Sequence, residues 1–206
     1  WFSGFRGNER HYHKIVRTAY RKFVMLVIVS TIPTGVIGIL FKDTVELAGT
    51  VLVVPGICLL ITSVFLVIAD YADEGTKRPR EASYVNAGLI GVAQGIATMP
   101  GLSRSGTTIT ACLLCGFEKK FAVKYSFIMS IPAVLGAVVL ELKDVAKAPL
   151  QASAVPACAV ATVISAIVGY LSICIMMRLI QGKKYKIFAV YCAIVGLITV
   201  GYGIFR

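Results

Sequence analysis

A polar stretch interrupts an otherwise apolar part of the chain. Residues 99–111 read MPGLSRSGTTITA, so one arginine and five hydroxyl side chains surround a Pro-Gly break. A guanidinium with hydroxyl groups close by can hold the oxygens of an anion, and its planar fork matches phosphate. An arginine inside hydrocarbon is costly unless it faces a wet cavity or a partner. The stretch therefore predicts an anion site, with phosphate as the best match.

The backbone around Arg104 favours the same chemistry. Pro100 and Gly101 end one helix, and Ser103 has the type and position of an N-cap for the next. The N–H groups of residues 104–106 would then lack helical partners, and the positive end of the helix dipole would point at the same volume. The candidate phosphate-binding residues are Gly101, Ser103, Arg104, Ser105, Gly106, Thr107, Thr108 and Gln94.

Several polar side chains near this stretch have two interpretations each. The Gln94 amide either faces the predicted cavity or bonds a neighbouring helix, and Tyr125, Ser126 and Ser130 either line that cavity or pack between helices. Arg104 could instead pair with a buried carboxylate, but neither arm around the Pro-Gly break contains an acidic residue. The anion site is the favoured interpretation of Arg104.

The composition places these residues in a membrane protein. Of 206 residues, 57% are hydrophobic and 15% are charged, against roughly 25% charged in a soluble domain. We expect an all-α polytopic membrane protein, with residues 1–206 as a single integral membrane domain. Apolar windows long enough to cross a bilayer are residues 23–41, 47–69, 121–141, 151–178 and 187–205.

Residues 85–116 are apolar at both ends and broken in the middle. Their arms, of about 15 and 12 residues, would be roughly 22 and 18 Å long as helices, so neither spans. As a re-entrant hairpin the segment leaves 16 Lys and Arg on one side of the membrane and 4 on the other, whereas a single crossing gives 12 and 8. The positive-inside bias predicts the hairpin, entering from the cytoplasm.

Net charge and cysteine content limit the kinds of partner that the protein could bind. The net charge is +11, and the basic residues fall in short loops between apolar spans. Basic residues at such positions are expected to interact with anionic lipid headgroups, so we expect no nucleic-acid partner. The six cysteines lie in apolar stretches, as small hydrophobes do, and the chain offers no metal-ligand set. Two segments echo each other weakly, STIPTGVIG at 30–38 and MSIPAVLGA at 129–137.

The quoted segments resemble a known family. GVAQGIATMPGLSRSGTTI followed by KYSFIMSIPAVLGA is similar to the second signature block of the undecaprenyl-diphosphate phosphatases, a family associated with bacitracin resistance. The motif Pro-Gly-x-Ser-Arg-Ser-x-x-Thr is matched throughout, from Pro100 to Thr108. The resemblance also covers STIPTGVIGILFKD and FAVYCAIVGL, and so almost the whole chain.

The resemblance implies a fold and an activity. It implies inverted repeats, each with one re-entrant hairpin, whose tips meet in a cavity open to the outside of the bacterial plasma membrane. The implied reaction is hydrolysis of undecaprenyl diphosphate, which recycles the lipid carrier for cell-wall synthesis, with Arg104, Ser103 and Ser105 as catalytic residues. A transporter or flippase for a phosphate-bearing anion or lipid is the alternative, and a non-catalytic scaffold is a third.

The family's other signature is a Glu/Gln-x-x-x-Glu motif followed by a Ser pair and a His, and it has no match here. Gln94 and Thr98 have that spacing, but Thr98 is not acidic. We expect the first hairpin to lie upstream of Trp1 and to carry the ligands of a divalent cation, Mg²⁺ or Ca²⁺. The expected partner is a prenyl diphosphate lipid, and a homodimer is left open.

Overall fold

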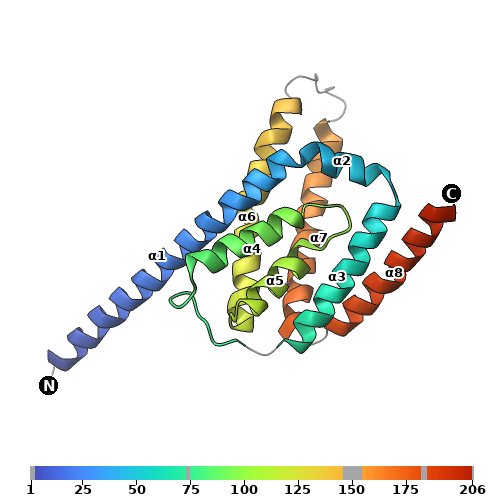
Figure 1. The fold of residues 1–206 in the computed structure, drawn as a ribbon. Coiled ribbons are helices and arrows are strands. Elements are labelled where there is room, and N and C mark those ends of the chain that lie inside the picture. Colours follow the sequence, from blue (N-terminus) through green and yellow to red (C-terminus); the bar gives the residue numbers. More distant parts are fainter. Residues whose placement is uncertain (1–2, 73–74, 146–154, 182–184, 206) are drawn as a thin grey trace.

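The fold was determined from a computed structural model that describes residues 3–72, 75–145, 155–181 and 185–205. Its regular elements in these ranges are α-helices (Figure 1). They are α1 (Ser3–Leu40), α2 (Lys42–Thr50), α3 (Val53–Tyr71), α4 (Tyr84–Ile96), α5 (Arg104–Leu114), α6 (Lys119–Val145), α7 (Val155–Gln181) and α8 (Tyr185–Phe205). Five of them, α1, α3, α6, α7 and α8, are long and apolar enough to cross a membrane. The prediction of an all-α polytopic membrane protein is confirmed.

One predicted boundary is wrong. The window at 47–69 does not begin a single span, because residues up to Thr50 belong to α2 and the spanning helix starts at Val53. Val51 between them is extended, with φ −102° and ψ 106°. Pro55 follows in the first turn of α3, where its missing N–H costs no helical bond. Hydropathy misses this bend because Val51 and Leu52 in the connection are themselves apolar. Residues 151–154 of the fourth window lie outside the described ranges.

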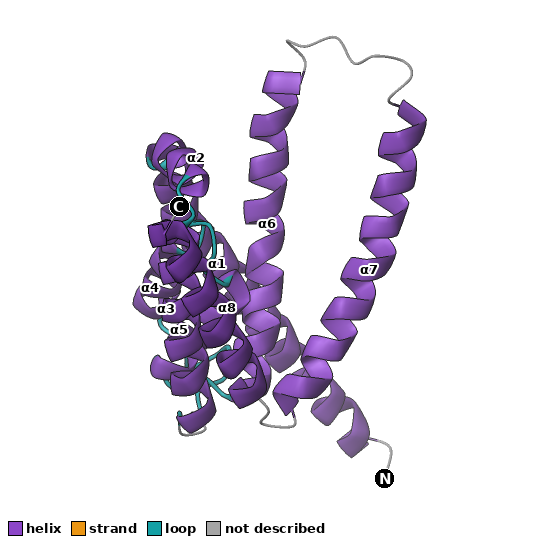
Figure 2. Cartoon of the chain, turned by 90° about the vertical axis from the view of Figure 1, so that its right-hand side faces the viewer, coloured by secondary structure: helices purple, strands orange, loops and turns teal. Residues whose placement is uncertain are grey.

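The helices differ in how closely they pack against the rest of the chain. α1 packs along α4, α3 packs along α8, and the short α5 contacts α3, α4 and α6. Figure 2 shows α1–α5 and α8 gathered together, with α6 beside them and α7 farther away. No residue of the apolar window of α7, Pro156–Ile175, is buried against the rest of the described chain.

α4 and α5 form a hairpin whose two ends meet. The backbone N–H of Lys77, before α4, donates to the carbonyl of Gly116, after α5, and the N–H of Glu118 donates to the carbonyl of Lys77, both at 3.0 Å. The Arg78 guanidinium pairs with Glu118 at 3.1 Å across the same junction. The chain thus enters and leaves the hairpin at one place, as re-entry requires. We call this the loop side, and the end where α3 begins the α2 side.

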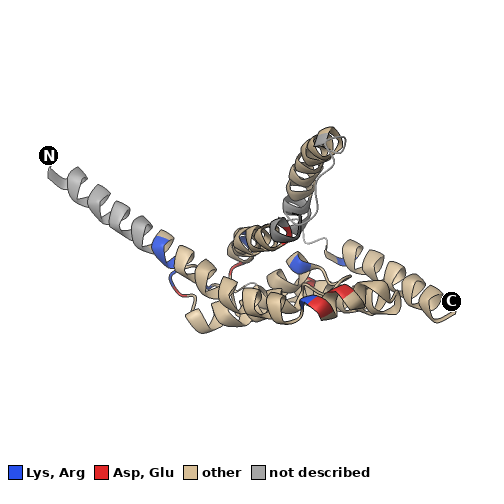
Figure 3. Cartoon of the chain, turned by 90° about the horizontal axis from the view of Figure 1, so that it is seen from above, with Lys and Arg blue, Asp and Glu red and all other residues tan. Residues whose placement is uncertain are grey.

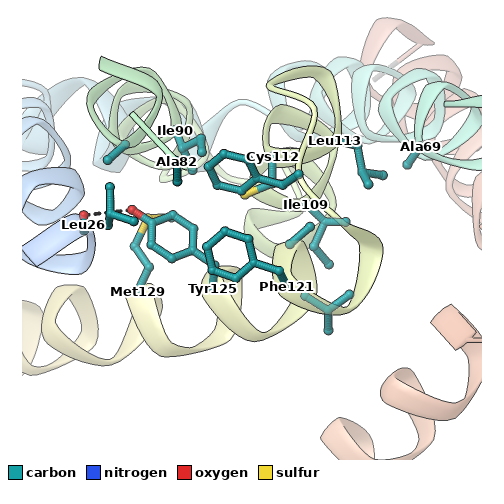
Figure 4. Packing of buried hydrophobic residues seen from close by; sticks show 14 of the residues in the cluster. Leu26, Ala69, Ala82, Ile90, Ile109, Cys112, Leu113, Phe121, Tyr125 and Met129 are labelled. Carbon is teal, nitrogen blue, oxygen red and sulfur yellow. Dashed lines mark hydrogen bonds between the residues drawn. The ribbon is translucent and has the colours of Figure 1, made fainter. Parts of the chain in front are cut away.

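An aromatic cluster joins the helices at the loop side. Phe117 and Phe121 stack with ring centroids 4.9 Å apart, and Tyr125 meets Phe23 edge-on at 5.9 Å. The Tyr125 hydroxyl donates to the carbonyl of Leu26 at 2.8 Å (Figure 4). These contacts fix α1, α6 and the end of α5 relative to one another, so the base of the hairpin is held at the loop side.

Charged side chains tie the loop side further. Lys22 on α1 donates to the carbonyl of Arg80, and Lys186 at the start of α8 lies 3.7 Å from Asp70 at the end of α3. Seen from above, most of the described helical surface carries no charge (Figure 3). Lys22, Arg80 and Lys186, which the sequence assigns to one side of the membrane, therefore lie together at the loop side of the fold.

Candidate phosphate site at the hairpin tip

Ser103 caps α5 as predicted. Its backbone is extended, with φ −69° and ψ 112°, and its hydroxyl oxygen accepts from the N–H of Gly106 at 3.1 Å. Its carbonyl accepts from the N–H of Thr107 at 2.9 Å. The N–H of Gly106 is therefore not free, which corrects the expected set of open donors. Within the described ranges the N–H groups of Arg104 and Ser105 make no hydrogen bond.

The turn before Ser103 depends on a close approach between two backbones. Gly101 has φ +89°, and a Cβ there would lie 2.3 Å from the carbonyl oxygen of Pro55. Both facts exclude a side chain, because L residues rarely adopt this φ and the neighbouring atom is backbone. The tip of the hairpin is thereby pressed against the first turn of α3.

A buried hydroxyl on α3 completes the anchoring. The Thr62 hydroxyl accepts from the N–H of Ser103 at 2.9 Å and donates to the carbonyl of Gly101 at 3.3 Å. Thr62 is 1% exposed, so water does not compete for these bonds. Sequence reasoning missed Thr62 because nothing in a threonine inside an apolar span indicates which turn it will face.

The first turn of α5 is supported from α6 as well. The Thr108 hydroxyl donates to the carbonyl of Arg104 at 2.8 Å and forms a short hydrogen bond, 2.5 Å, with the Ser126 hydroxyl. Ser126 therefore packs against the site from behind. Ser130 donates to Phe127 in its own helix at 2.7 Å. Of the interpretations left open for Tyr125, Ser126 and Ser130, the packing one fits the observed contacts.

A cavity of about 680 Å³ lies beside the tip. It is bounded by the α2-side halves of α1 and α6, by α2, by α4 and by Arg104 at the start of α5. Of the predicted phosphate-binding residues, Arg104 and Gln94 line it, whereas Ser103, Gly106 and Thr108 are engaged in the contacts just described. The cavity is also lined by Thr98, which the sequence analysis named for its spacing from Gln94, and by polar side chains that the sequence did not single out, namely Thr31, Thr34, Lys42, Glu46 and Glu141.

Arg104 is half-buried and has no ion-pair partner among the described residues. Glu46 and Glu141 line the same cavity, but neither carboxylate lies within 4.0 Å of the guanidinium, and Glu46 lies 3.7 Å from Lys42. The alternative in which Arg104 is neutralised by a buried acid is therefore not what the fold shows. Its fork remains available to an anion in the cavity.

Gln94 combines the two interpretations that the sequence left open. It lines the cavity, and its amide nitrogen lies 3.4 Å from the Thr34 hydroxyl and 3.5 Å from the carbonyl of Met129. The side chain is 1% exposed, and its amide oxygen has no partner among the described residues. An unpartnered polar atom in so buried a place is costly, and an amide oxygen is satisfied only by a hydrogen-bond donor or a cation, so the group of Gln94 that can meet a phosphate oxygen is its amide nitrogen.

The other predicted residues take supporting positions. Ser105 is half-buried beside Arg104, and the Thr107 hydroxyl is buried with no partner in the described part of the chain. The described residues hold no group of three His, Cys, Asp or Glu side chains placed to bind a metal ion. The two carboxylates at the cavity, Glu46 and Glu141, do not by themselves fit a divalent cation.

Fold and site together define a class: a polytopic membrane protein with a re-entrant hairpin that presents an arginine and a helix N-terminus to a membrane cavity. The model of the family described as bacitracin resistance protein BacA matches residues 1–198, and the chain belongs to that family.

Curated relatives support this placement. The chain is 41% identical over 194 residues to the undecaprenyl-diphosphatase of Methanosphaera stadtmanae, covering 93% of this chain and 67% of the relative. It is 39% identical over 180 residues to that of Halothermothrix orenii, covering 87% and 70%. For Methanobrevibacter smithii the values are 42% over 182 residues, covering 87% and 65%. The chain thus matches about two thirds of the length of these relatives.

Proposed function

We propose that this protein is an undecaprenyl-diphosphate phosphatase, which hydrolyses the lipid diphosphate to undecaprenyl phosphate and inorganic phosphate. The relatives carry that name at 34–42% identity. The observation that carries the proposal is Arg104, whose guanidinium has no ion-pair partner among the described residues and which lines the cavity; its own backbone N–H and that of Ser105 make no hydrogen bond in the same part of the chain. That set of donors suits a charged phosphate group that must lie next to a lipid chain.

The reaction breaks the anhydride bond between the two phosphorus atoms. Water supplies an oxygen to the terminal phosphorus, and the bridging oxygen leaves with the lipid monophosphate. We assign Arg104 to the diphosphate oxygens, together with the N–H groups of Arg104 and Ser105 and the dipole of α5. The hydroxyl hydrogens of Ser103 and Ser105 are free to donate to the same oxygens, since Ser103 uses its oxygen lone pair for the cap.

Other residues of the hairpin tip hold Arg104 and the turn before it in position. Thr108 directs its hydroxyl to the Arg104 carbonyl, and Gly101 and Gly106 let the turn pack closely. Gln94 faces the cavity from α4, where its amide can meet a phosphate oxygen. Thr107 lies one turn behind and contributes to the buried end of the site.

A divalent cation, Mg²⁺ or Ca²⁺, would neutralise phosphate oxygens in such a reaction. Because the described residues do not form its ligand set, we derive no step through it and place its ligands in a first hairpin of the kind the family resemblance implies. We further propose that residues 1–206 form one membrane domain and that the cavity opens to the outside of the plasma membrane. The predominance of basic residues on the loop side supports this orientation.

The test is phosphate release from undecaprenyl diphosphate by the purified full-length protein in lipid nanodiscs, compared with Arg104→Ala and Arg104→Lys. We expect release by the wild type and a loss of roughly 100-fold or more in both variants, because Lys keeps the charge but not the fork. Unchanged rates in Arg104→Ala would overturn the assignment. Movement of an intact diphosphate across the bilayer without hydrolysis would favour the transporter instead.

A further inference from the structure

The two echoing segments, 30–38 and 129–137, lie on opposite walls of the cavity. The first is on α1 and the second on α6, and the aromatic cluster holds these helices together at the loop side. Both contain a proline inside the helix, Pro33 and Pro132. The residues that line the cavity from these segments are Thr31, Thr34, Gly35 and Gly38 on α1 and Pro132, Ala133, Leu135, Gly136 and Ala137 on α6.

A second hollow adjoins the cavity along α1. This hollow, of about 310 Å³, shares Thr31, Gly35 and Pro132 with the cavity and extends to Val27 and Ile28. At 1.5 Å per residue, the distance along α1 from Val27 to Leu40, its last residue, is roughly 20 Å. We call the space between α1 and α6, made up of the cavity and this adjoining open hollow, the slot.

The slot has polar side chains beside the hairpin and charged side chains, Lys42, Glu46 and Glu141, at its α2 side, and apolar side chains line much of the rest. Arg104 and Gln94 lie on its hairpin wall, whereas Ile39, Leu135 and Val139 line it farther along. A ligand that fits has an anionic head and a thin apolar chain directly attached to it.

Glycines keep the slot open. A Cβ at Gly35, Gly38 or Gly136 would meet nothing within 4 Å, so these glycines are not required for helix contact. Gly91 on α4 is different, because a Cβ there would lie 2.1 Å from the carbonyl oxygen of Ser30. Glycine is a poor helix former, and at the slot its small size leaves room for a ligand.

We propose that the phosphate-proximal isoprenyl units of the substrate lie in this slot, and that Gly35 and Gly136 set its width. The inference rests on the proposed function and adds the binding place of the chain and two specificity-determining residues. Larger side chains at either glycine would exclude the chain while leaving the donors around Arg104 in place.

The experiment uses full-length protein in nanodiscs and measures phosphate release from farnesyl and undecaprenyl diphosphate by wild type, Gly35→Leu and Gly136→Leu. Gly88→Leu and Gly201→Leu are matched controls, since their positions are equally open but do not line the cavity. We expect KM to rise at least about tenfold in the slot variants, as expected when about two methylene groups lose their burial. The controls should match wild type.

A second measurement does not require active variants. Wild type is irradiated with a prenyl diphosphate that carries a diazirine on its first isoprenyl unit, and labelled peptides are identified by mass spectrometry. Labels in 30–38 and 129–137 are expected, whereas labels confined to α7 and α8 would overturn the slot. Equal KM values in the slot and control variants would overturn it while leaving the phosphatase intact. A wild type that releases no phosphate would overturn both proposals.

Discussion

The hydroxyl of Thr62 on α3 accepts a hydrogen bond from the backbone N–H of Ser103 at 2.9 Å. Ser103 caps α5 and precedes Arg104, so a residue distant in sequence fixes where the anion-binding turn begins. The same hydroxyl donates to the carbonyl of Gly101 at 3.3 Å, so both sides of the turn are held by one side chain. The position of the guanidinium thus depends on α3 as well as on the hairpin.

Thr62→Val should lower the rate of phosphate release because it leaves the Ser103 N–H and the Gly101 carbonyl unsatisfied. Leaving such groups unsatisfied costs about 1–3 kcal/mol each, so we expect a decrease in kcat of roughly tenfold or more with a smaller change in KM. Thr162→Val is the matched control, since that exposed hydroxyl bonds only its own helix, at Cys158. A Thr62→Val enzyme with wild-type kcat would show that the tip keeps its position without this anchor.

Gly101→Ala should destabilise the protein strongly. The new Cβ would meet the Pro55 carbonyl oxygen at 2.3 Å in a backbone conformation of φ +89°. Such strain costs about 1–3 kcal/mol before any clash is counted. The thermal unfolding midpoint in detergent, read by intrinsic fluorescence, should fall clearly, whereas Gly88→Ala, at an open helical position, should leave it unchanged or raise it. Equal midpoints for the two variants would contradict the proposed close packing.

Ser126→Ala should weaken catalysis more than folding. Its hydroxyl meets Thr108, whose hydroxyl holds the Arg104 carbonyl. We expect kcat to fall about threefold to tenfold, in line with the loss of one buried hydrogen bond of about 1 kcal/mol. Ser130→Ala, which removes only a bond within α6, should retain wild-type kinetics. The reverse order of effects would place the functional contact elsewhere on α6.

The re-entrant path predicts a pattern of labelling. In a cysteine-free background, Glu81→Cys before the hairpin and Lys120→Cys after it should both react with a membrane-impermeant thiol reagent only from the cytoplasm. Ser103→Cys and Glu46→Cys should react only from outside. A single crossing would place Glu81 and Lys120 on opposite sides, so labelling of these two from different compartments would contradict the hairpin.

The sequence predicted the Ser103 cap and the short arms of the hairpin better than the helix boundaries around them. Ser103 could be assigned as an N-cap because capping depends on residues one to three positions away. The two arms around Pro100 and Gly101 could be recognised as a hairpin because each is too short to span a bilayer. The excess of basic residues on one side of the membrane also favours a hairpin over a single crossing. The start of α3 was placed wrongly, because Val51 and Leu52 are apolar even though they connect two helices.

Local sequence by itself was enough to predict a helix break at Pro100 and Gly101, a cap at Ser103 and a membrane environment. Each of these follows from residue type or from short spacing along the chain. Only the tertiary structure decided that Thr62 and Ser126 support the hairpin tip, that Gln94 lines the cavity, and that 30–38 and 129–137 line opposite walls of it. These relationships join positions tens of residues apart, and their geometry is set by how helices pack rather than by the pattern within any one of them.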